Sequence, residues 1–369
     1  MFSGYPSPGS NTMTGNHQRN ITLAAIQMDA TFAPLSDRLQ RADALVAQAA
    51  AGRADLVALP ELFNTGYIYS DDLVRRAEDI HGPTVSWMRE KAAHHGIHLA
   101  GSLLLREKGQ VYNALLLVAP DGRVWRYDKS YPWGWERACF RGRKGITVAQ
   151  TDLGDIGLMI CWDAAHLNLW QQYSGQVDLM LICSCPPDVT NPTFAFDAGQ
   201  PIALDDFGML GRTLKDTGRL LFGDMVNQQT AWLGVPTLQT TGTGRLRTPL
   251  PNGFWSLLAF LPMAPKLARY LRRAKSVSLE CDFIPGCKIV DHLGQVRSEL
   301  PEARGEALTL AEVSLPPVKA RPRAPQPKSL LPGIAYLASD VILPLLMRSV
   351  YRAALRQTNR TSTAEFYQV

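Results

Sequence analysis

Three buried apolar runs each end beside a residue with reactive chemistry, and this pattern constrains the fold more than any other feature of the chain. The run at 55–59 leads to Glu61, the run at 123–128 leads to Lys129, and the run at 156–160 leads to Cys161. Short apolar runs bounded by turn residues are typical of buried strands. Because α/β folds carry their chemistry at the carboxyl ends of strands, the sequence predicts a carboxylate, an amine and a thiol at strand ends.

The rest of the chain alternates between the periodicities of strands and helices. Apolar residues at helical spacing predict helices over 36–51, 83–96, 165–173 and 204–217, with Pro83 opening the second and Gly96 closing it. The apolar runs predict strands over 21–27, 55–59, 97–105, 111–119, 123–129, 156–161, 177–182, 219–226, 286–291 and 307–313. Mixed strands with covering helices favour a layered α/β structure.

Four pieces of the chain resemble the nitrilase, or carbon–nitrogen hydrolase, superfamily in its amidase-like branch. Glu136 follows Lys129 by seven residues and precedes Phe140 and Gly142, as the second glutamate of that family does. The other pieces are Pro60-Glu61-Leu62-Phe63-Asn64-Thr65-Gly66-Tyr67, Tyr127-Asp128-Lys129-Ser130-Tyr131-Pro132 and Gly157-Leu158-Met159-Ile160-Cys161-Trp162-Asp163. The resemblance covers about 21–313 and implies a four-layer αββα sandwich.

The catalytic assignment joins this resemblance to the chemistry of the side chains. A thiol is mostly protonated at neutral pH, so Cys161 needs a base, and Glu61 is the expected one. Lys129 would stabilise the oxyanion together with the backbone N–H of Trp162. Glu136 would position Lys129 or assist a proton transfer; the alternative is a salt bridge to a neighbouring arginine, Arg137 or Arg141. The expected product of attack on an amide is a Cys161 thioester, without a metal or cofactor.

The expected substrate pocket is aromatic, with Tyr67, Trp133, Trp135, Trp162 and His166 as candidate binding residues. Aromatic residues near a loop can equally be core. His166 follows Cys161 by five residues, too close in sequence for the usual Cys–His pair, and we expect a surface or pocket-wall position. The family often has an apolar-Pro-Glu piece after its cysteine motif, which residues 166–169 lack. This departure leaves the substrate preference open on the motif alone. The basic, apolar segments described below predict an amide with a long or bulky apolar acyl part, such as a lipid-like amide.

Three activities and one non-enzymatic role therefore remain as hypotheses. The leading one is amide hydrolysis, and the others are nitrile hydrolysis, transfer of the acyl group to an amine, and a catalytically silent docking scaffold. Six cysteines are too few for a disulfide scaffold, which favours a reducing cytoplasmic setting. Nucleic-acid signatures are not found. The resemblance implies a homodimer or larger assembly with contacts from the segment after Cys161.

Positive charge is concentrated in two segments outside the predicted catalytic body. The net charge is +7 over 245–279 and +6 over 314–369, although the whole chain carries only +5. We predict a hydrolase domain over 21–315 with a basic, apolar insertion over about 243–285, a C-terminal extension over 316–369, and a disordered tail over 1–20. Neither basic segment reads as a membrane span, because proline and charge interrupt each apolar run. They suit docking on the anionic inner face of a membrane, or packing on another subunit.

Overall fold

The computed structural model describes residues 19–190, 192–197, 200–262, 264–301, 305–322 and 325–366. Residues 1–18 of the predicted disordered tail lie outside this part of the chain. Arg19 and Asn20, which the prediction assigned to that tail, begin the first strand and pair with Leu315 and Ser314. Strand pairing thus starts two residues earlier than expected.

The first of two large sheets contains the strands that precede Glu61 and Lys129. Its seven strands run in the order β12-β1-β2-β3-β4-β5, with β17 pairing antiparallel to β1. The strands are β12 (Gly242–Thr243), β1 (Arg19–Asp29), β2 (Leu56–Ala58), β3 (His98–Glu107), β4 (Gln110–Val118), β5 (Val124–Asp128) and β17 (Ala307–Leu315). A hairpin turn at Gly122 joins β4 to β5, and the left-handed φ of 87° at this position explains the glycine.

The second large sheet contains the strand that precedes Cys161. Its six strands run in the order β16-β15-β11-β8-β7-β6. They are β16 (Val296–Glu299), β15 (Lys288–Val290), β11 (Thr237–Thr240), β8 (Leu179–Cys183), β7 (Gly154–Ile160) and β6 (Val148–Thr151). All five residues of β8 are buried, as expected for a parallel strand in the centre of a covered sheet.

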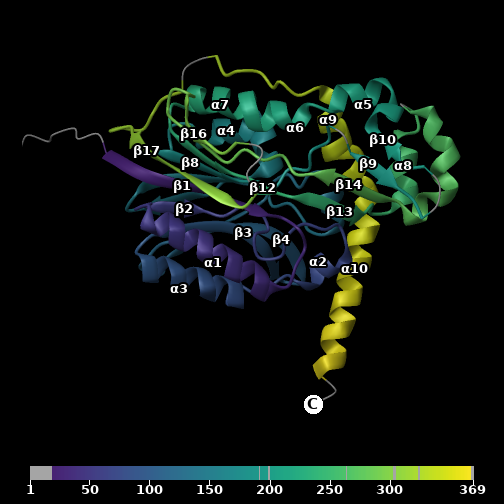
Figure 1. Ribbon diagram of the computed structural model, residues 1–369, viewed down its shortest axis with the longest axis horizontal. Coiled ribbons are helices and arrows are strands. Elements are labelled where there is room, and N and C mark those ends of the chain that lie inside the picture. Colours follow the sequence, from purple (N-terminus) through teal and green to yellow (C-terminus); the bar gives the residue numbers. More distant parts are fainter. Residues whose placement is uncertain are drawn as a thin grey trace, which may run out of the picture.

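Helices cover the outer face of each sheet, so the body has the four layers α, β, β and α that the resemblance implied (Figure 1). One outer layer contains α1 (Leu35–Ala51) and α3 (Pro83–His95), with α2 (Asp71–Arg75) beside them. The other contains α4 (Leu167–Tyr173), α6 (Thr217–Leu220) and α7 (Val226–Leu233). Pro83 stands at the start of α3, and Gly96 caps its end with a φ of 66°.

Alternation along the strands separates two cores on the two faces of the first sheet. Leu23 and Leu56 belong to the core that includes β7 and β8. Ala24 and Val57, their neighbours in sequence, belong to the core that includes α1 and α3. Successive side chains of a strand point to opposite faces, so the apolar residues of β1 and β2 serve both layers. The continuous apolar run is therefore a consequence of burial on both sides.

The predicted strand over 219–226 is wrong, because this stretch is helical. The chain forms α6, then a π-helical turn, η4 (Leu221–Met225), and then α7. Leu221, Phe222, Met225 and Val226 are buried against the second sheet. A short apolar run does not by itself distinguish a strand from a buried helix, and the packing against the sheet decides between them.

The predicted insertion does not stand alone but joins an earlier segment to form a third, small sheet. The order is β10-β9-β14-β13, in which β9 (Thr193–Ala195) and β10 (Ile202–Ala203) precede the insertion. The insertion supplies β13 (Arg245–Pro249), α8 (Gly253–Phe260), the 3₁₀ segment η5 (Pro265–Ser276) and β14 (Ser278–Asp282). The short segments η3 (Leu204–Phe207) and α5 (Met209–Leu214) lie beside this sheet.

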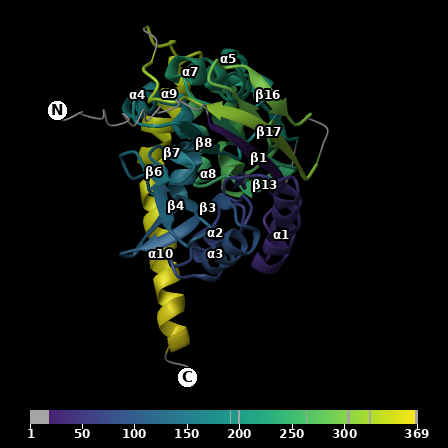
Figure 2. The same ribbon diagram turned by 90° about the vertical axis from the view of Figure 1, so that its left-hand side faces the viewer.

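The C-terminal extension packs on its own body. It forms one continuous helical rod from α9 (Gly333–Tyr336) through the π-helical η6 (Leu337–Ile342) to α10 (Leu343–Phe366). Pro344 does not break this rod. Proline lacks an N–H and clashes with the carbonyl four residues earlier, and a π turn relieves that clash just before Pro344. The far end of α10 extends beyond the body (Figure 2).

By length and composition alone, the part of this rod from Gly333 to Thr358 could cross a membrane. A single helix of this kind is weak evidence for a span. The side chains on its inner face pack against the body, since Ala335, Leu343, Met347 and Tyr351 are all buried. The helical rod therefore contributes to the tertiary structure of the enzyme body.

Candidate active site

The three reactive side chains predicted at strand ends are gathered at the same edge of the two sheets. Glu61 follows β2 and Lys129 follows β5, both in the first sheet, whereas Cys161 follows β7 in the second. Leu62 and Cys161 adopt left-handed backbone with φ of 51° and 50°, uncommon for residues with a side chain. Such strained positions cost about 1–3 kcal/mol each and concentrate at functional sites.

The Lys129 ammonium lies between two buried carboxylates. Its Nζ donates to Oε1 of Glu61 at 2.7 Å and to Oε1 and Oε2 of Glu136 at 2.9 and 2.7 Å. All three side chains are almost completely buried. Glu136 pairs with Lys129, and among the described ion pairs it has none with Arg137 or Arg141, so its geometry matches the positioning role.

Glu61 is fixed by two further donors. The Asn113 side-chain amide donates to Oε1 at 2.7 Å, and the backbone N–H of Cys185 donates to Oε2 at 3.1 Å. Ser102 donates to Asn113 at 2.9 Å and accepts from the N–H of Leu62 at 3.0 Å. The sequence prediction missed Asn113, although a buried amide within the apolar run 111–119 was the available signal.

Glu136 is held by the loop that carries it and by Tyr67. The Tyr67 hydroxyl donates to Glu136, and the backbone N–H of Trp133 donates to Oε2 at 2.7 Å. This places Glu136 in η1 (Gly134–Ala138) with its carboxylate turned towards Lys129. Burial raises the pKa of Tyr67 well above its ordinary value, and the charge of Glu136 raises it further. The phenol therefore stays protonated and continues to donate.

Asp163 connects the turn that carries Cys161 to the segment after Lys129. Its carboxylate accepts from the N–H of Ile160 at 3.2 Å, from the N–H of Tyr131 at 2.7 Å and from the hydroxyl of Tyr127 at 2.8 Å. The first of these bonds caps η2 (Cys161–Ala165). Asp163 is thus a capping residue, and it fixes Cys161 relative to the first sheet.

The electrostatics of the site favour a neutral thiol beside a carboxylate that titrates near neutrality. Burial raises the pKa of Glu61 to about 7, although the Lys129 charge opposes this. Burial and the Glu61 charge raise the pKa of the Cys161 thiol well above its ordinary value. Burial alone would lower the pKa of Lys129, but the carboxylates of Glu136 and Glu61 outweigh it and raise that pKa. Lys129 therefore remains a cation at any physiological pH.

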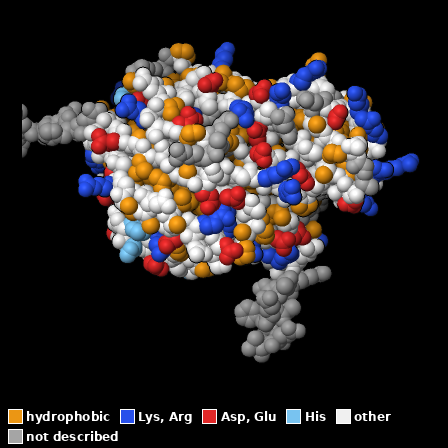
Figure 3. Space-filling view, in the orientation of Figure 1, with side chains coloured by type: hydrophobic (Ala, Val, Ile, Leu, Met, Phe, Trp, Pro, Cys, Tyr) orange, Lys and Arg blue, Asp and Glu red, His pale blue; other side chains and the backbone are white. Residues whose placement is uncertain are grey.

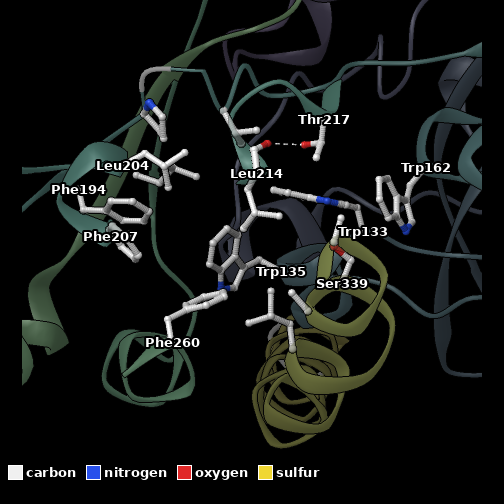
Figure 4. Close-up of a pocket in the computed structure, with 16 residues that line it drawn as sticks. Trp133, Trp135, Trp162, Phe194, Leu204, Phe207, Leu214, Thr217, Phe260 and Ser339 are labelled. Carbon is white, nitrogen blue, oxygen red and sulfur yellow. Dashed lines mark hydrogen bonds between the residues drawn. The ribbon is translucent and has the colours of Figure 1, made fainter. Parts of the chain in front are cut away.

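Cys161 lines a small cavity that lies beside a larger apolar one. The first, of about 40 Å³, is lined by Cys161 and Glu136 among others, and the second has about 90 Å³. Trp133, Trp162 and Val189 line both cavities, so the two are adjacent. Figure 4 shows the side chains of the larger cavity, which come from the catalytic body at η1 and η2, from the third sheet and the helical segments beside it, from α6 and α8, and from the C-terminal rod. The labelled apolar side chains around it are Trp133, Trp135, Trp162, Phe194, Leu204, Phe207, Leu214 and Phe260.

The C-terminal rod is anchored to the residue that follows the nucleophile. The indole N–H of Trp162 donates to Oδ1 of Asp340 at 3.1 Å, and Nε2 of His166 lies 3.1 Å from Oδ2. The His166 ring is stacked on Tyr131, with ring centroids 3.5 Å apart. Tyr336 donates to the carbonyl of Ala165 at 2.7 Å. The extension thus covers part of the segment after Cys161, which sequence reasoning assigned to a subunit contact.

The five candidate substrate-binding residues divide into two groups. Trp133, Trp135 and Trp162 line the apolar cavity, as expected for a pocket wall. Tyr67 and His166 line neither cavity, because Tyr67 is turned to Glu136 and His166 to Asp340. Among the residues that the structure describes, no three His, Cys, Asp or Glu side chains form a group that could hold a metal ion.

Fold and site together define a thiol-containing α/β sandwich with a buried Glu-Lys-Cys arrangement. The carbon-nitrogen hydrolase family matches residues 22–219, more than half of the chain. The chain therefore belongs to the carbon-nitrogen hydrolase family.

Curated relatives include both amidases and nitrilases. The omega-amidase NIT2 of Mus musculus is 31% identical over 168 residues, which cover 41% of this chain and 58% of that protein. A nitrilase of Pyrococcus abyssi is 27% identical over 147 residues, or 39% and 56% of the two chains. An (R)-stereoselective amidase of a Pseudomonas species is 28% identical over 113 residues, or 31% and 41%. The matched region thus spans about half the length of these relatives.

Solved structures share the fold across most of the chain. Nit3 of Saccharomyces cerevisiae, a nitrilase superfamily member, has a TM-score of 0.58 at 19% identity, covering 80% of this chain and 90% of that one. An amidase of Nesterenkonia sp. AN1, with acrylamide added at its active-site cysteine, has a TM-score of 0.56 at 17% identity, covering 79% and 92%. At these identities the likeness establishes the four-layer fold.

Proposed function

We propose that this protein hydrolyses a non-peptide amide whose acyl part is bulky and apolar, through a thioester on Cys161. The observation that carries the proposal is the position of Cys161. Cys161 lines a small cavity together with Glu136, and the larger apolar cavity lies beside it. The amidases among the relatives support the choice of an amide over other carbon–nitrogen bonds.

The proposed reaction begins with proton transfer from the Cys161 thiol to the Glu61 carboxylate. The sulfur attacks the carbonyl carbon, and the oxyanion is stabilised by Lys129 and by the backbone N–H of Trp162. Collapse of the intermediate breaks the carbon–nitrogen bond, and the leaving amine takes the proton from Glu61. Water then attacks the thioester while Glu61 accepts a proton from it, and the acid and the free thiol are released.

The surroundings of the larger cavity support an apolar acyl group. Phe194 and Phe207 come from the region of the third sheet, Phe260 from α8, and Ala338 and Leu343 from the C-terminal rod. Transfer of apolar surface out of water contributes about 25 cal/mol per Å². A longer acyl chain would therefore gain binding energy until it fills the cavity.

The same proposal includes peripheral docking on an anionic membrane surface. Leu337, Val341 and Leu345 follow one another at a spacing of four on the rod, with exposed fractions of 46%, 50% and 57%. The +6 charge of the extension and the +7 charge of the insertion complement anionic lipid. Figure 3 shows Lys and Arg side chains along the edge of the molecule formed by the insertion. An apolar stripe beside basic residues suits a helix that lies in the membrane interface.

The decisive experiment supplies amides and nitriles of increasing acyl length and follows both the products and the mass of the intact protein. We expect free acid and amine, with a transient acyl adduct on Cys161 that accumulates in Glu61→Gln. The matched control is Cys287→Ala, which removes a buried thiol in the second sheet region. If only nitriles are turned over, nitrile hydrolysis would replace amide hydrolysis as the proposed activity. If a new amide forms when an amine is added, acyl transfer would replace it. Turnover of none would support the scaffold hypothesis.

Membrane docking and self-association have separate tests. Wild-type protein should float with anionic vesicles at low salt, and the double variant Leu337→Ser with Val341→Ser should float less. Equal flotation of the two proteins would show that the apolar stripe does not contribute to membrane docking. Light scattering should give the mass of a dimer or larger assembly. A monomer at all concentrations would contradict the assembly expected from the family resemblance.

A further inference from the structure

A groove rich in arginine lies between α10 and the loop that carries Glu136. It has a volume of about 480 Å³ and shares no lining residue with the apolar cavity. Arg137 and Arg141 line it from one side, and Arg348 and Arg352 line it from α10. Residues more than 200 positions apart in the chain thus place four guanidinium groups around one hollow. Gln110 and Tyr351 complete its polar lining.

These four positive charges have no carboxylate partner among the side chains that the structure describes. None of the described ion pairs includes Arg137, Arg141, Arg348 or Arg352, and no acidic residue lines the groove. Arg141 donates one long hydrogen bond of 3.3 Å to Gln110. The Nε of Arg137 is buried without a hydrogen-bond partner. The observation that favours a ligand is the lining itself, because guanidinium groups without a carboxylate partner suit a ligand that accepts hydrogen bonds.

The charges around Arg137 include both signs. Burial lowers the pKa of Arg137, the carboxylates of Asp340, Glu136 and Asp163 raise it, and the guanidinium of Arg348 lowers it. Arg348 thus lies close enough to Arg137 to repel it, and an anion in the groove would offset that repulsion. The other basic segment, η5, differs because its Arg269 and Arg272 line none of the cavities described above.

We propose that this groove is a binding site for a phosphate group, separate from the catalytic centre. Guanidinium groups present planar pairs of donors that match phosphate oxygens. A phosphomonoester brings about two negative charges and three acceptor oxygens, whereas a single carboxylate offers one charge and two oxygens. Four unpaired guanidiniums are therefore balanced better by the phosphate. The phosphate can belong to a soluble compound or to a lipid headgroup.

Binding in this groove would connect two parts of the enzyme. The phosphate would bridge α10 to the segment that begins at Arg137, the residue directly after Glu136. α10 packs against η1 and α8, and Leu343 at its start lines the apolar cavity. The bound ligand would thus stabilise the docked position of the rod, and unfolding would occur at a higher temperature.

The first test measures inorganic phosphate binding by calorimetry and thermal unfolding at constant ionic strength, with chloride as the reference salt. Wild type and Cys161→Ala should bind phosphate equally, because the groove does not include the thiol. Arg348→Ala with Arg352→Ala should weaken binding at least about tenfold, as expected when charge-assisted hydrogen bonds are lost. The control, Arg269→Ala with Arg272→Ala, loses the same charge from η5 and should bind as wild type does.

Several outcomes would overturn the proposal. They are the absence of phosphate binding by wild type, equal weakening in the two double variants, and citrate binding as tightly as phosphate. If the α10 variant fails to fold, Arg141→Ala alters an exposed side chain of the same groove and should still weaken binding. Failure of amide turnover would leave this measurement unaffected, so the two proposals fail independently.

A vesicle measurement identifies the source of the phosphate. Phosphatidylcholine vesicles containing phosphatidate are compared with vesicles containing the same share of oleate, which carries a carboxylate. Preference for phosphatidate that is lost in the α10 double variant and competed by inorganic phosphate assigns the site to a lipid headgroup. Phosphate binding without this preference assigns it to a soluble compound. Equal binding to both vesicle types, together with no response to inorganic phosphate, contradicts the site.

Discussion

The strand-end site and the apolar cavity differ in how their residues are fixed. Glu61, Lys129 and Cys161 each follow a buried strand directly, and each is held by several short hydrogen bonds or by a strained turn. The cavity combines Trp133, Trp135 and Trp162 of the sandwich with mostly apolar side chains from the third sheet, α8 and the C-terminal rod. Under the proposed function, the chemistry would reside in the sandwich, and the added elements would contribute to substrate choice.

The strand-end site and the apolar cavity are connected through Trp162. Trp162 directly follows the nucleophile and lines both cavities, and its indole donates to Asp340 of the rod. One residue thus belongs to the catalytic turn through its backbone and to the cavity through its side chain. Changes on the two sides of Trp162 should therefore affect different kinetic parameters.

The largest effect is expected from loss of the nucleophile. Cys161→Ala should reduce kcat/KM by at least about a thousandfold, since the residues of such a catalytic group act as a unit. Cys287→Ala should retain activity and measures the effect of losing a buried thiol elsewhere. Steady-state kinetics on the best amide decide the matter, and a Cys161→Ala protein with wild-type activity would place the chemistry outside the strand-end site.

Loss of the buried cation should damage both rate and stability. Lys129→Met removes the proposed oxyanion donor, which would cost about a hundred- to a thousandfold in rate. It also leaves two buried carboxylates without a counter-charge, which would cost about 3–5 kcal/mol. Glu136→Gln should have a smaller effect on rate and stability, because Lys129 retains its ion pair with Glu61. Denaturant unfolding and kinetics of the two variants provide the measurement. Unchanged stability of Lys129→Met would show that the buried ion pairs are not maintained in solution.

The pH dependence should report Glu61. With its pKa raised to about 7, kcat/KM should rise with pH through about 7 as the base ionises. This limb should be absent from the residual activity of Glu61→Gln. The Cys161 thiol, whose pKa is well above its ordinary value, cannot account for an acidic limb near neutrality.

The same shift affects stability with a defined sign. Between the ordinary carboxyl pKa and about 7, the folded protein binds more protons at Glu61 than the unfolded chain does. The contribution of Glu61 to stability is therefore present at low pH and is lost as the pH rises through about 7. Glu61→Gln should remove this component from the pH profile of the free energy of unfolding, and an unchanged profile would contradict the raised pKa.

The smallest effect is expected at the connection between the two regions. Asp340→Ala removes the acceptor of Trp162 and the partner of His166. It should reduce kcat/KM about tenfold for long acyl chains, in the range expected for charged hydrogen bonds, and much less for short ones. Asp340→Asn should recover part of the loss by retaining an acceptor. Asp37→Asn, at an exposed position of α1, is the charge-matched control. Equal losses of kcat/KM for short and long amides in Asp340→Ala would argue against a role of Asp340 in the cavity wall.

Local patterns predicted the strand-end residues, and the family resemblance predicted the four-layer body. The strand-end motifs predicted where Glu61, Lys129 and Cys161 would lie, because a buried strand followed by a turn is encoded by neighbouring residues. The same local reasoning failed over 219–226, where an apolar run suited either a strand or a buried helix and packing on the second sheet selected the helix. Asn113 was missed because its hydrogen bond to Glu61 joins separate strands.

The cavity wall and the arginine groove were decided by tertiary structure alone. Sequence patterns distinguished the basic C-terminal extension but left its partner open between a membrane and another subunit, and the structure packs it on its own chain through Asp340 and Tyr336. Arg137 and Arg348 acquire a shared groove only when α10 crosses η1. Contacts between distant segments depend on how whole layers pack, and no periodicity within a single segment specifies them.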